Sequence, residues 1–286
     1  MIIRVRRIAA VCALGTALTA LAACSAPQPV RAPRATAGSA IASASPAAGP
    51  PTLAPGPAGL TPVFEHGPRT GDRAVALTFD ADMTADQGPR AARGERFDNP
   101  GLIAALRELK VPATVFMTGR WAEQYPRQAR SLGRDPLFEI ANHSYSHYAF
   151  TEDCYGLPTV DEERMRTDVE RAYAAFREAG VPDPMPYFRF PGGCHDTRAL
   201  RALTPAGVTA VQWDVVSGDA FATDAGAVAR EVLDGVRPGS VVVLHCTLSA
   251  APTTERVVRD VVPELRGKGF RFVKVSELIG ASGGRR

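Results

Sequence analysis

The feature that most constrains the fold is an alternation of short apolar runs with longer amphipathic stretches. The runs are typical of strands buried on both faces, and the stretches carry apolar residues at helical spacing. This repeat predicts parallel strands joined by crossover helices. We therefore expect an α/β fold, a distorted (β/α) barrel of about seven parallel strands. The predicted strands are residues 74–79, 113–117, 138–141, 187–190, 209–213, 240–244 and 270–273, and the predicted helices are residues 100–110, 122–132, 160–179, 197–203, 225–236 and 254–268.

Nearly all chemically capable side chains follow the ends of predicted strands. Because the carboxyl ends of parallel strands meet at one rim, these side chains should lie close together. Polar residues of a merely solvated surface would be scattered over the helices as well. The convergence predicts an enzyme active site formed by Asp80, Asp82, His143, His147, Arg189, Asp214, Asp219 and His245.

Two of these residues, His143 and His147, lie close together in the segment HSYSH. They are either solvated imidazoles at a helix start or half of a metal site. Neutral imidazoles and one carboxylate are a usual ligand set for zinc with an open position for water. An aspartate after a strand most often caps a turn or helix, but Asp80 and Asp82 share the rim with the histidines. One carboxylate can bind the metal, and the other can take a proton from the water.

The motifs of this rim resemble those of NodB-homology polysaccharide deacetylases, carbohydrate esterase family 4. Five motifs appear in the family's order across residues 73–246. HSYSH matches H-[ST]-x-x-H, FRFPGG matches R-x-P, and VLH matches L-x-H. TFDAD stands where the family usually has TFDDG, and WDVVSGDA stands where it has D-x-x-D-W. The resemblance implies a NodB-like fold and hydrolysis of acetyl groups on a polysaccharide.

The resemblance also implies a role for each matched residue. The predicted metal ligands are His143, His147 and Asp82, and zinc is the expected divalent ion. A backbone N–H near Gly192 is the implied oxyanion donor. The implied catalytic residues are the base Asp80, the arginine Arg189 that braces it, the general acid His245 and its partner Asp219.

The sequence departs from the family pattern at three motifs. The family's metal-binding aspartate directly follows the base, but that position is Ala81 here, so Asp82 is assigned as the ligand. Gly192 replaces the usual aromatic residue, which removes a surface for stacking on sugars. Val216 and Ala220 replace the first aspartate and the tryptophan of the fourth motif. The walls of the substrate groove should therefore differ from those of better-known members.

The expected substrate is a cell-wall polysaccharide, most simply the N-acetylglucosamine of peptidoglycan or a chitin-like glycan. An O-acetyl polysaccharide esterase and a catalytically silent glycan-binding lipoprotein are the alternatives. The net charge of +3 comes from three arginines at the N-terminus, and the remaining basic and acidic residues balance. No nucleic acid partner is expected, and we expect a monomer.

The N-terminus resembles the export signal of a bacterial lipoprotein. A basic start is followed by uncharged residues 8–23, too short for a membrane span. The segment ends in LAAC, which resembles a lipobox and predicts lipidation of Cys24. An ordinary signal peptide is the alternative. The lipoprotein interpretation predicts a protein exported and anchored to the outer face of the bacterial cell membrane.

Three regions follow from these features: a signal peptide over residues 1–23, a tether over residues 24–61, and a deacetylase domain over residues 62–286. The tether is rich in Ala and Pro and has no acidic or aromatic residue. Such a segment buries too little apolar surface to offset the entropy of ordering, which predicts disorder.

Three cysteines, Cys154, Cys194 and Cys246, remain in the predicted domain. In an exported protein two of them can form a disulfide. Cys194 directly follows Gly193 near the predicted site, and a bond to Cys154 is suspected. Cys246 follows His245 and is expected to be a disulfide partner or a small buried thiol.

Overall fold

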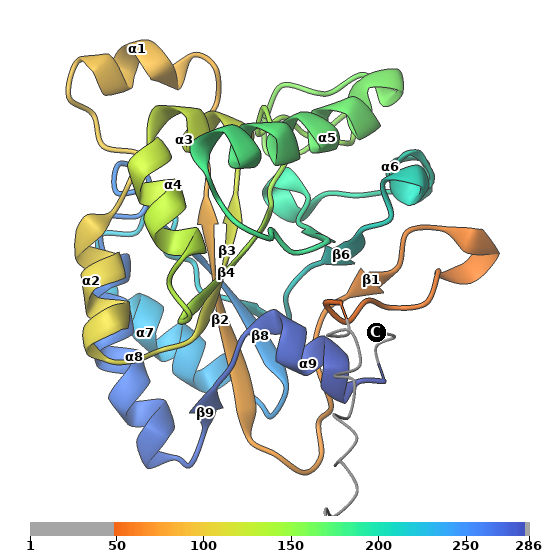
Figure 1. Cartoon of the computed structure of the whole chain (residues 1–286). Coiled ribbons are helices and arrows are strands. Elements are labelled where there is room, and N and C mark those ends of the chain that lie inside the picture. Colours follow the sequence, from red (N-terminus) through yellow and green to blue (C-terminus); the bar gives the residue numbers. More distant parts are fainter. Residues whose placement is uncertain (1–48, 284–286) are drawn as a thin grey trace, which may run out of the picture. The chain divides into compact units, whose positions relative to one another are not determined.

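The computed structural model describes residues 49–283 (Figure 1). The predicted signal peptide, Cys24 and the tether up to residue 48 lie outside these residues. Within the described part of the chain, no helix is both long enough and apolar enough to cross a membrane.

A sheet of nine strands forms the centre of the domain, and all of its paired strands are parallel. The strand order is β1-β6-β5-β4-β3-β2-β8-β7, with β9 paired to β2. This confirms the predicted α/β class and the dominance of parallel strands. The strands are β1 (Val63–Phe64), β2 (Ala74–Ala81), β3 (Ala113–Met117), β4 (Phe138–Asn142), β5 (Tyr187–Phe188), β6 (Thr209–Val211), β7 (Val215–Val216), β8 (Ser240–His245) and β9 (Arg271–Phe272).

Helices pack around the outside of this sheet (Figure 1). α8 contacts both α2 and α7, and α5 contacts α3, α4 and α6. These seven helices therefore form two groups along the sheet. The helices of the described residues are α1 (Gln87–Ala92), α2 (Pro100–Glu108), α3 (Gly119–Gln124), α4 (Pro126–Gly133), α5 (Glu162–Ala179), α6 (Thr197–Leu203), α7 (Ala225–Gly235), α8 (Thr254–Gly267) and α9 (Val275–Ala281).

The sheet is curled so that its two ends approach each other. β6 and β7 are consecutive in the chain, yet they lie near opposite ends of the strand order. The segment 212–214 connects them: Gln212 N–H donates to Phe64 O of β1 at 2.8 Å, and Asp214 N–H donates to Val241 O of β8 at 3.2 Å. A short crossing segment, rather than a ladder of paired strands, thus spans the gap, as expected for a distorted barrel.

The alternation of side chains along β2 separates two apolar clusters and places Asp80. Val75, Leu77 and Phe79 belong to the cluster beneath the helices, whereas Ala74 and Ala76 belong to a second cluster with Leu278 of α9. Because side chains alternate between the faces of a strand, Asp80 shares the face of the two alanines. In register it lies beside Phe116 of β3 and His245 of β8.

α9 closes the amino-terminal end of the curled sheet and was not predicted. Val275 N–H donates to Thr114 Oγ1 at 2.9 Å, and Ser276 N–H donates to Glu139 Oε1 at 3.1 Å. Thr114 also donates to Glu139 at 2.8 Å. These contacts provide hydrogen-bond partners for the buried Thr114 and Glu139 at this end. The candidate catalytic residues lie at the opposite rim.

The structure corrects several predicted boundaries. The helix expected over 122–132 is two helices, because Pro126 lacks an N–H and disfavours helical geometry at Tyr125. Residues 85–99, for which no helix was predicted, contain α1. The short strands β1 and β7 were missed because two residues carry no periodicity.

The end of the predicted tether packs on the domain. Pro51 O accepts a hydrogen bond from Tyr187 Oη at 2.8 Å, and Leu53 N–H donates to Thr209 Oγ1 at 3.3 Å. Thr61 is buried. Pro51, Leu53 and Thr61, within the range predicted as a tether, therefore contact or are buried against the domain.

Candidate active site

A buried ion pair lies at the carboxyl end of β2. Asp80 Oδ1 accepts a hydrogen bond from Arg189 Nη1 at 2.7 Å, and neither side chain is more than 6 % exposed. Arg189 also donates to Val211 O and Gln212 O, at 3.2 and 3.3 Å. Its guanidinium lies 3.9 Å from the centroid of the Phe116 ring. The arginine is thus fixed on several sides and holds one carboxylate oxygen of Asp80.

The charge state of Asp80 follows from this pairing. Burial alone would raise its pKa, because it disfavours the charged carboxylate. The charge of Arg189 and the neighbouring histidines outweigh burial, and the pKa of Asp80 lies below its ordinary value. The second oxygen, Oδ2, faces His143 Nε2 at 3.6 Å. An ionised carboxylate with one free oxygen is available as a proton acceptor.

The two histidines of HSYSH lie beside the two aspartates. The rings of His143 and His147 have centroids 5.0 Å apart, and His147 Nε2 lies 3.8 Å from Asp82 Oδ2. His143 Nδ1 contacts the backbone O of Arg189 at 2.9 Å, so this nitrogen carries the proton and Nε2 keeps its lone pair. Asp82 Oδ1 accepts a hydrogen bond from the Thr247 hydroxyl.

The protonation states of this group suit binding of a cation. Burial lowers the pKa of His143, and it lowers the pKa of His147 to about 4. Both imidazoles are therefore neutral at neutral pH. Burial acts against the charge of Asp82, but the histidines and the hydrogen bond from Thr247 outweigh it and lower the pKa of Asp82. The result is two neutral nitrogen ligands and one carboxylate, the donor set that zinc prefers.

The geometry gives a second test of fit. Within residues 49–283, no three His, Cys, Asp or Glu side chains form a group close enough to hold a metal ion as they stand. The 3.6 and 3.8 Å contacts are too long for hydrogen bonds. The distance from His147 to Asp82 falls within the roughly 3–4 Å that separates two atoms each lying about 2.1 Å from one ion, whereas the 3.6 Å contact joins His143 to Asp80. The three donors therefore fit a divalent cation in chemistry, and one pair, His147 and Asp82, also fits in spacing.

His245 lies on the other side of Asp80 and has a different environment. Its Nδ1 contacts Asp219 Oδ1 at 2.8 Å, and its backbone N–H donates to Asp219 Oδ2 at 2.8 Å. Asp219 is fully buried and also accepts from the hydroxyls of Ser217, at 2.9 Å, and Thr254, at 2.7 Å. Every approach to this carboxylate is occupied by a donor.

The pairing with Asp219 makes His245 a cation. Burial would lower the pKa of His245, but the hydrogen bond and charge of Asp219 overcome it and raise the pKa to about 9. Burial alone would raise the pKa of Asp219, but the hydrogen bond and charge of His245 outweigh it, and the pKa of Asp219 is lowered. His245 can therefore donate a proton at neutral pH, as expected for a general acid.

A disulfide joins Cys154 and Cys194 next to Gly192, which confirms the suspected pair. Gly192 has φ +65°, and a Cβ added there would lie only 2.6 Å from the Cys154 sulfur. Any larger residue would displace the bridge, which explains why the usual aromatic residue is absent. Cys246 is buried and free, and burial raises the pKa of its thiol to about 12. It is a packing residue, not a nucleophile.

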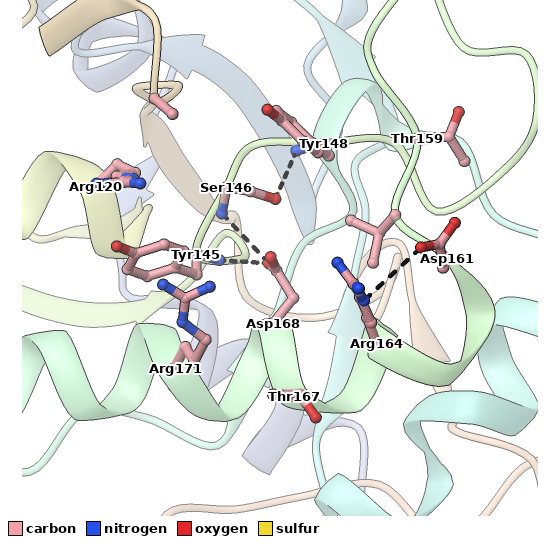
Figure 2. Close-up of a pocket in the computed structure, with 12 residues that line it drawn as sticks. Arg120, Tyr145, Ser146, Tyr148, Thr159, Asp161, Arg164, Thr167, Asp168 and Arg171 are labelled. Atoms are coloured by element: carbon pink, nitrogen blue, oxygen red, sulfur yellow. Dashed lines mark hydrogen bonds and ion pairs between the residues drawn. The ribbon is translucent and has the colours of Figure 1, made fainter.

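A pocket of about 450 Å³ lies between the loop that carries the histidines and α5 (Figure 2). Asp168 of α5 accepts from the backbone N–H groups of Tyr145, at 2.7 Å, and Ser146, at 3.3 Å. The Tyr145 ring lies between the guanidinium groups of Arg120 and Arg171, which are 4.9 and 3.8 Å from its centroid. These contacts attach the histidine loop to α5, so the pocket's walls support the site.

Most of the rim residues expected from the sequence are brought together, and one is not. Asp214 instead accepts from Arg69 at 2.8 Å and from Val241 N–H at 2.7 Å, at the opposite end of the barrel. The reason is that it precedes β7 and does not end β6. The sequence analysis missed the supporting residues Thr247, Thr254, Ser217 and Asp168, because a hydroxyl or carboxylate that bonds to a distant loop leaves no local pattern.

Comparison with known proteins agrees with this geometry. The profile of the family described as "Polysaccharide deacetylase" matches residues 67–211, just over half of the chain. The chain belongs to this family. The matched range includes Asp80, Asp82, both histidines and Arg189, whereas the His245–Asp219 pair lies beyond it. The predicted resemblance to NodB-homology deacetylases is thus confirmed.

Named relatives of this polysaccharide deacetylase chain cover most of its length. A chitooligosaccharide deacetylase of Sinorhizobium fredii is 31% identical over 212 residues, 70% of this chain and 89% of the relative. A peptidoglycan-N-acetylglucosamine deacetylase of Bacillus cereus is 26% identical over 211 residues, 73% of this chain and 89% of the relative. The crystal structure of the Bc1960 peptidoglycan N-acetylglucosamine deacetylase has a TM-score of 0.63 at 25% identity, covering 79% of this chain and 96% of that chain.

Proposed function

We propose that this protein hydrolyses the N-acetyl groups of a cell-wall polysaccharide, the N-acetylglucosamine of peptidoglycan or of a chitin-like glycan. The observation that carries the proposal is one ionised and one protonated group, Asp80 and His245, side by side in register and next to a histidine–carboxylate cluster. Asp80 is a base with a free oxygen, and His245 is an acid with a pKa of about 9. The named relatives act on chitooligosaccharide and peptidoglycan.

Asp82, His143 and His147 would hold a divalent ion, and we propose zinc because two neutral imidazoles and a carboxylate are its usual ligands. When bound, the ion supplies Lewis-acid chemistry that acidifies water and polarises the acetyl carbonyl. Asp80 Oδ2 accepts the proton of the attacking water while Arg189 holds Oδ1. The backbone N–H at Gly192 donates to the developing oxyanion.

His245 completes the reaction on the leaving-group side. Cleavage of an amide requires protonation of the departing amine, because an unprotonated amine is a poor leaving group. His245 donates this proton, and Asp219 stabilises the imidazolium that exists before the transfer. The base and the acid are therefore distinct residues whose environments move their pKa values apart.

Acetate release tests the proposal. The purified protein with added Zn²⁺ should release acetate from peptidoglycan or N-acetylglucosamine oligomers, and Asp80→Asn should abolish the release. Parallel assays on O-acetylated xylan separate an amidase from an esterase. No release from any of these substrates, together with no bound metal, would leave a glycan-binding protein without catalysis.

We also propose that the chain is a lipoprotein acting as a monomer at the outer face of the cell membrane. The proposal rests on the lipobox-like LAAC at Cys24 and on the Ala/Pro-rich segment that follows it. Cys24→Ser should move the protein from the membrane fraction to the soluble fraction without changing its specific activity. Membrane retention of this variant would contradict the anchor.

A further inference from the structure

Two exposed aromatic side chains flank the proposed active site. Tyr155 is 87 % exposed and Phe221 is 83 % exposed, and among the described residues the only other large hydrophobic side chain with high exposure is Val216. A single exposed apolar residue is ordinary on a protein surface. The position of these two residues relative to the catalytic groups is what distinguishes them.

Tyr155 occupies the space next to the glycine that replaces the family's usual aromatic residue. A Cβ built on Gly192 would lie 3.3 Å from Tyr155 Cδ2. Gly192 carries the proposed oxyanion donor and lies three positions after Arg189. The aromatic ring at this wall of the site therefore comes from another loop, which the Cys154–Cys194 disulfide joins to the Gly192 loop.

Phe221 lies on the side of the general acid. It follows Asp219, the partner of His245, by two positions. Its backbone N–H donates to Ala250 O at 2.6 Å, which fixes its loop to the loop that follows His245. In the strand order, β5 and β7, which precede the Gly192 and Phe221 loops, lie on opposite sides of β2. The two rings thus border the site from different sides.

The backbone of both residues is held in an unfavourable conformation. Tyr155 has φ +52° and Phe221 has φ +61°, in the left-handed region that bulky residues rarely adopt. Such strain persists only where surrounding contacts impose it, and it is frequent at ligand-binding sites. Here the disulfide and the Phe221–Ala250 hydrogen bond lie beside the strained residues, whose side chains are exposed to solvent.

We propose that Tyr155 and Phe221 are substrate-binding residues that stack on the pyranose rings flanking the sugar being deacetylated. A pyranose presents an apolar face of C–H groups, and an aromatic ring covers such a face with little loss of side-chain entropy. The proposal rests on the proposed function, because it assigns specificity for the substrate of the same site. It predicts a preference for oligomers over the monosaccharide.

Steady-state kinetics on N-acetylglucosamine oligomers of increasing length test the assignment. Tyr155→Ala and Phe221→Ala should each raise KM for a hexamer by about three- to tenfold, with kcat nearly unchanged, and the double variant should raise it further. Tyr155→Phe and Phe221→Tyr are matched controls that keep the ring and should behave like the wild type. Hydrolysis of 4-nitrophenyl acetate, which needs no flanking sugar, should be unaffected in all variants.

Binding to a catalytically inactive background separates this inference from the proposed function. Hexamer binding to Asp80→Asn, measured by calorimetry, should weaken when Tyr155→Ala or Phe221→Ala is added. Deacetylation with an unchanged KM in both alanine variants would overturn the stacking role and leave the function intact. Absence of deacetylation with ring-dependent hexamer binding would overturn the function and leave the stacking role intact. Absence of deacetylation together with hexamer binding that does not depend on the rings would overturn both the proposed function and the stacking role.

Discussion

The two histidine regions of the site have opposite electrostatic environments. Nδ1 of His143 faces a backbone carbonyl, whereas Nδ1 of His245 faces the buried carboxylate of Asp219 at 2.8 Å. Burial lowers the pKa of His143 and lowers that of His147 to about 4. At His245 burial acts in the same direction, but the hydrogen bond and charge of Asp219, with the charges of Asp80 and Asp82, outweigh it and raise the pKa to about 9. The partner of one ring nitrogen thus decides whether a buried histidine can serve as a ligand or as an acid.

The largest effect is expected from loss of a proposed metal ligand. His143→Ala removes one of the proposed nitrogen donors, so bound zinc should fall from about one ion per chain to near zero. Deacetylation should fall by at least about 10³-fold, since the remaining groups lack Lewis-acid assistance. Metal analysis and acetate release measure the two effects. His66→Ala, at an exposed histidine, is the control, and full metal content in His143→Ala would refute the assigned ligand set.

Loss of the proposed general acid His245 should leave metal binding intact. His245→Ala should lower kcat for the amide substrate by about 10²–10⁴-fold, the usual contribution of a general acid. Its zinc content should equal that of the wild type. The loss on 4-nitrophenyl acetate should be much smaller, because nitrophenolate leaves without protonation. Equal losses on the amide and the ester would mean that His245 does not protonate the leaving group.

Asp219→Asn should bring the pKa of His245 closer to that of an ordinary histidine. The wild-type His245 is protonated below a pKa of about 9, so activity should decline as pH rises through about 9. Without the charge of Asp219, the pKa of His245 falls, and the decline should begin at lower pH. A pH–rate profile of kcat/KM measures the shift. An unmoved basic limb would show that another group controls it.

The smallest effects should come from two supporting threonines. Thr247 contacts the proposed metal ligand Asp82, and Thr254 contacts Asp219, the partner of His245. Thr247→Val removes the hydroxyl from Asp82 and should weaken zinc affinity by about 10–100-fold without moving the pH profile. Thr254→Val removes a donor from Asp219 and should alter the basic limb without weakening zinc binding. The two variants control for each other. Identical phenotypes would mean that metal binding and the pKa of His245 are not controlled independently.

The sequence predicted the site better than it predicted the sheet's edges. The long runs around Asp80, His143 and His245 were recognisable, since strands buried on both faces are almost continuously apolar. Their terminal polar residues therefore marked the rim. β1 and β7 are held by tertiary contacts across only a few residues, and such elements carry too little local signal.

The misplacement of Asp214 has the same origin. Spacing along the chain put it after a strand, but Asp214 precedes β7 and pairs with Val241 near the start of β8, at the other end of the barrel. The supporting residues Thr247, Thr254 and Asp168 were invisible for a related reason, because each acts on a group distant in sequence. Local patterns locate reactive groups, whereas their orientation depends on contacts between loops.

The backbone from Val211 to Asp219, which includes the crossing segment 212–214, links the surroundings of the proposed base and the proposed acid. The carbonyls of Val211 and Gln212 hold the guanidinium that braces Asp80, and shortly afterwards the same stretch delivers Asp219 to His245. A deletion or insertion between them would misalign proton removal and proton delivery at once. Homologues free to lengthen their outer loops should therefore keep this stretch at a constant length.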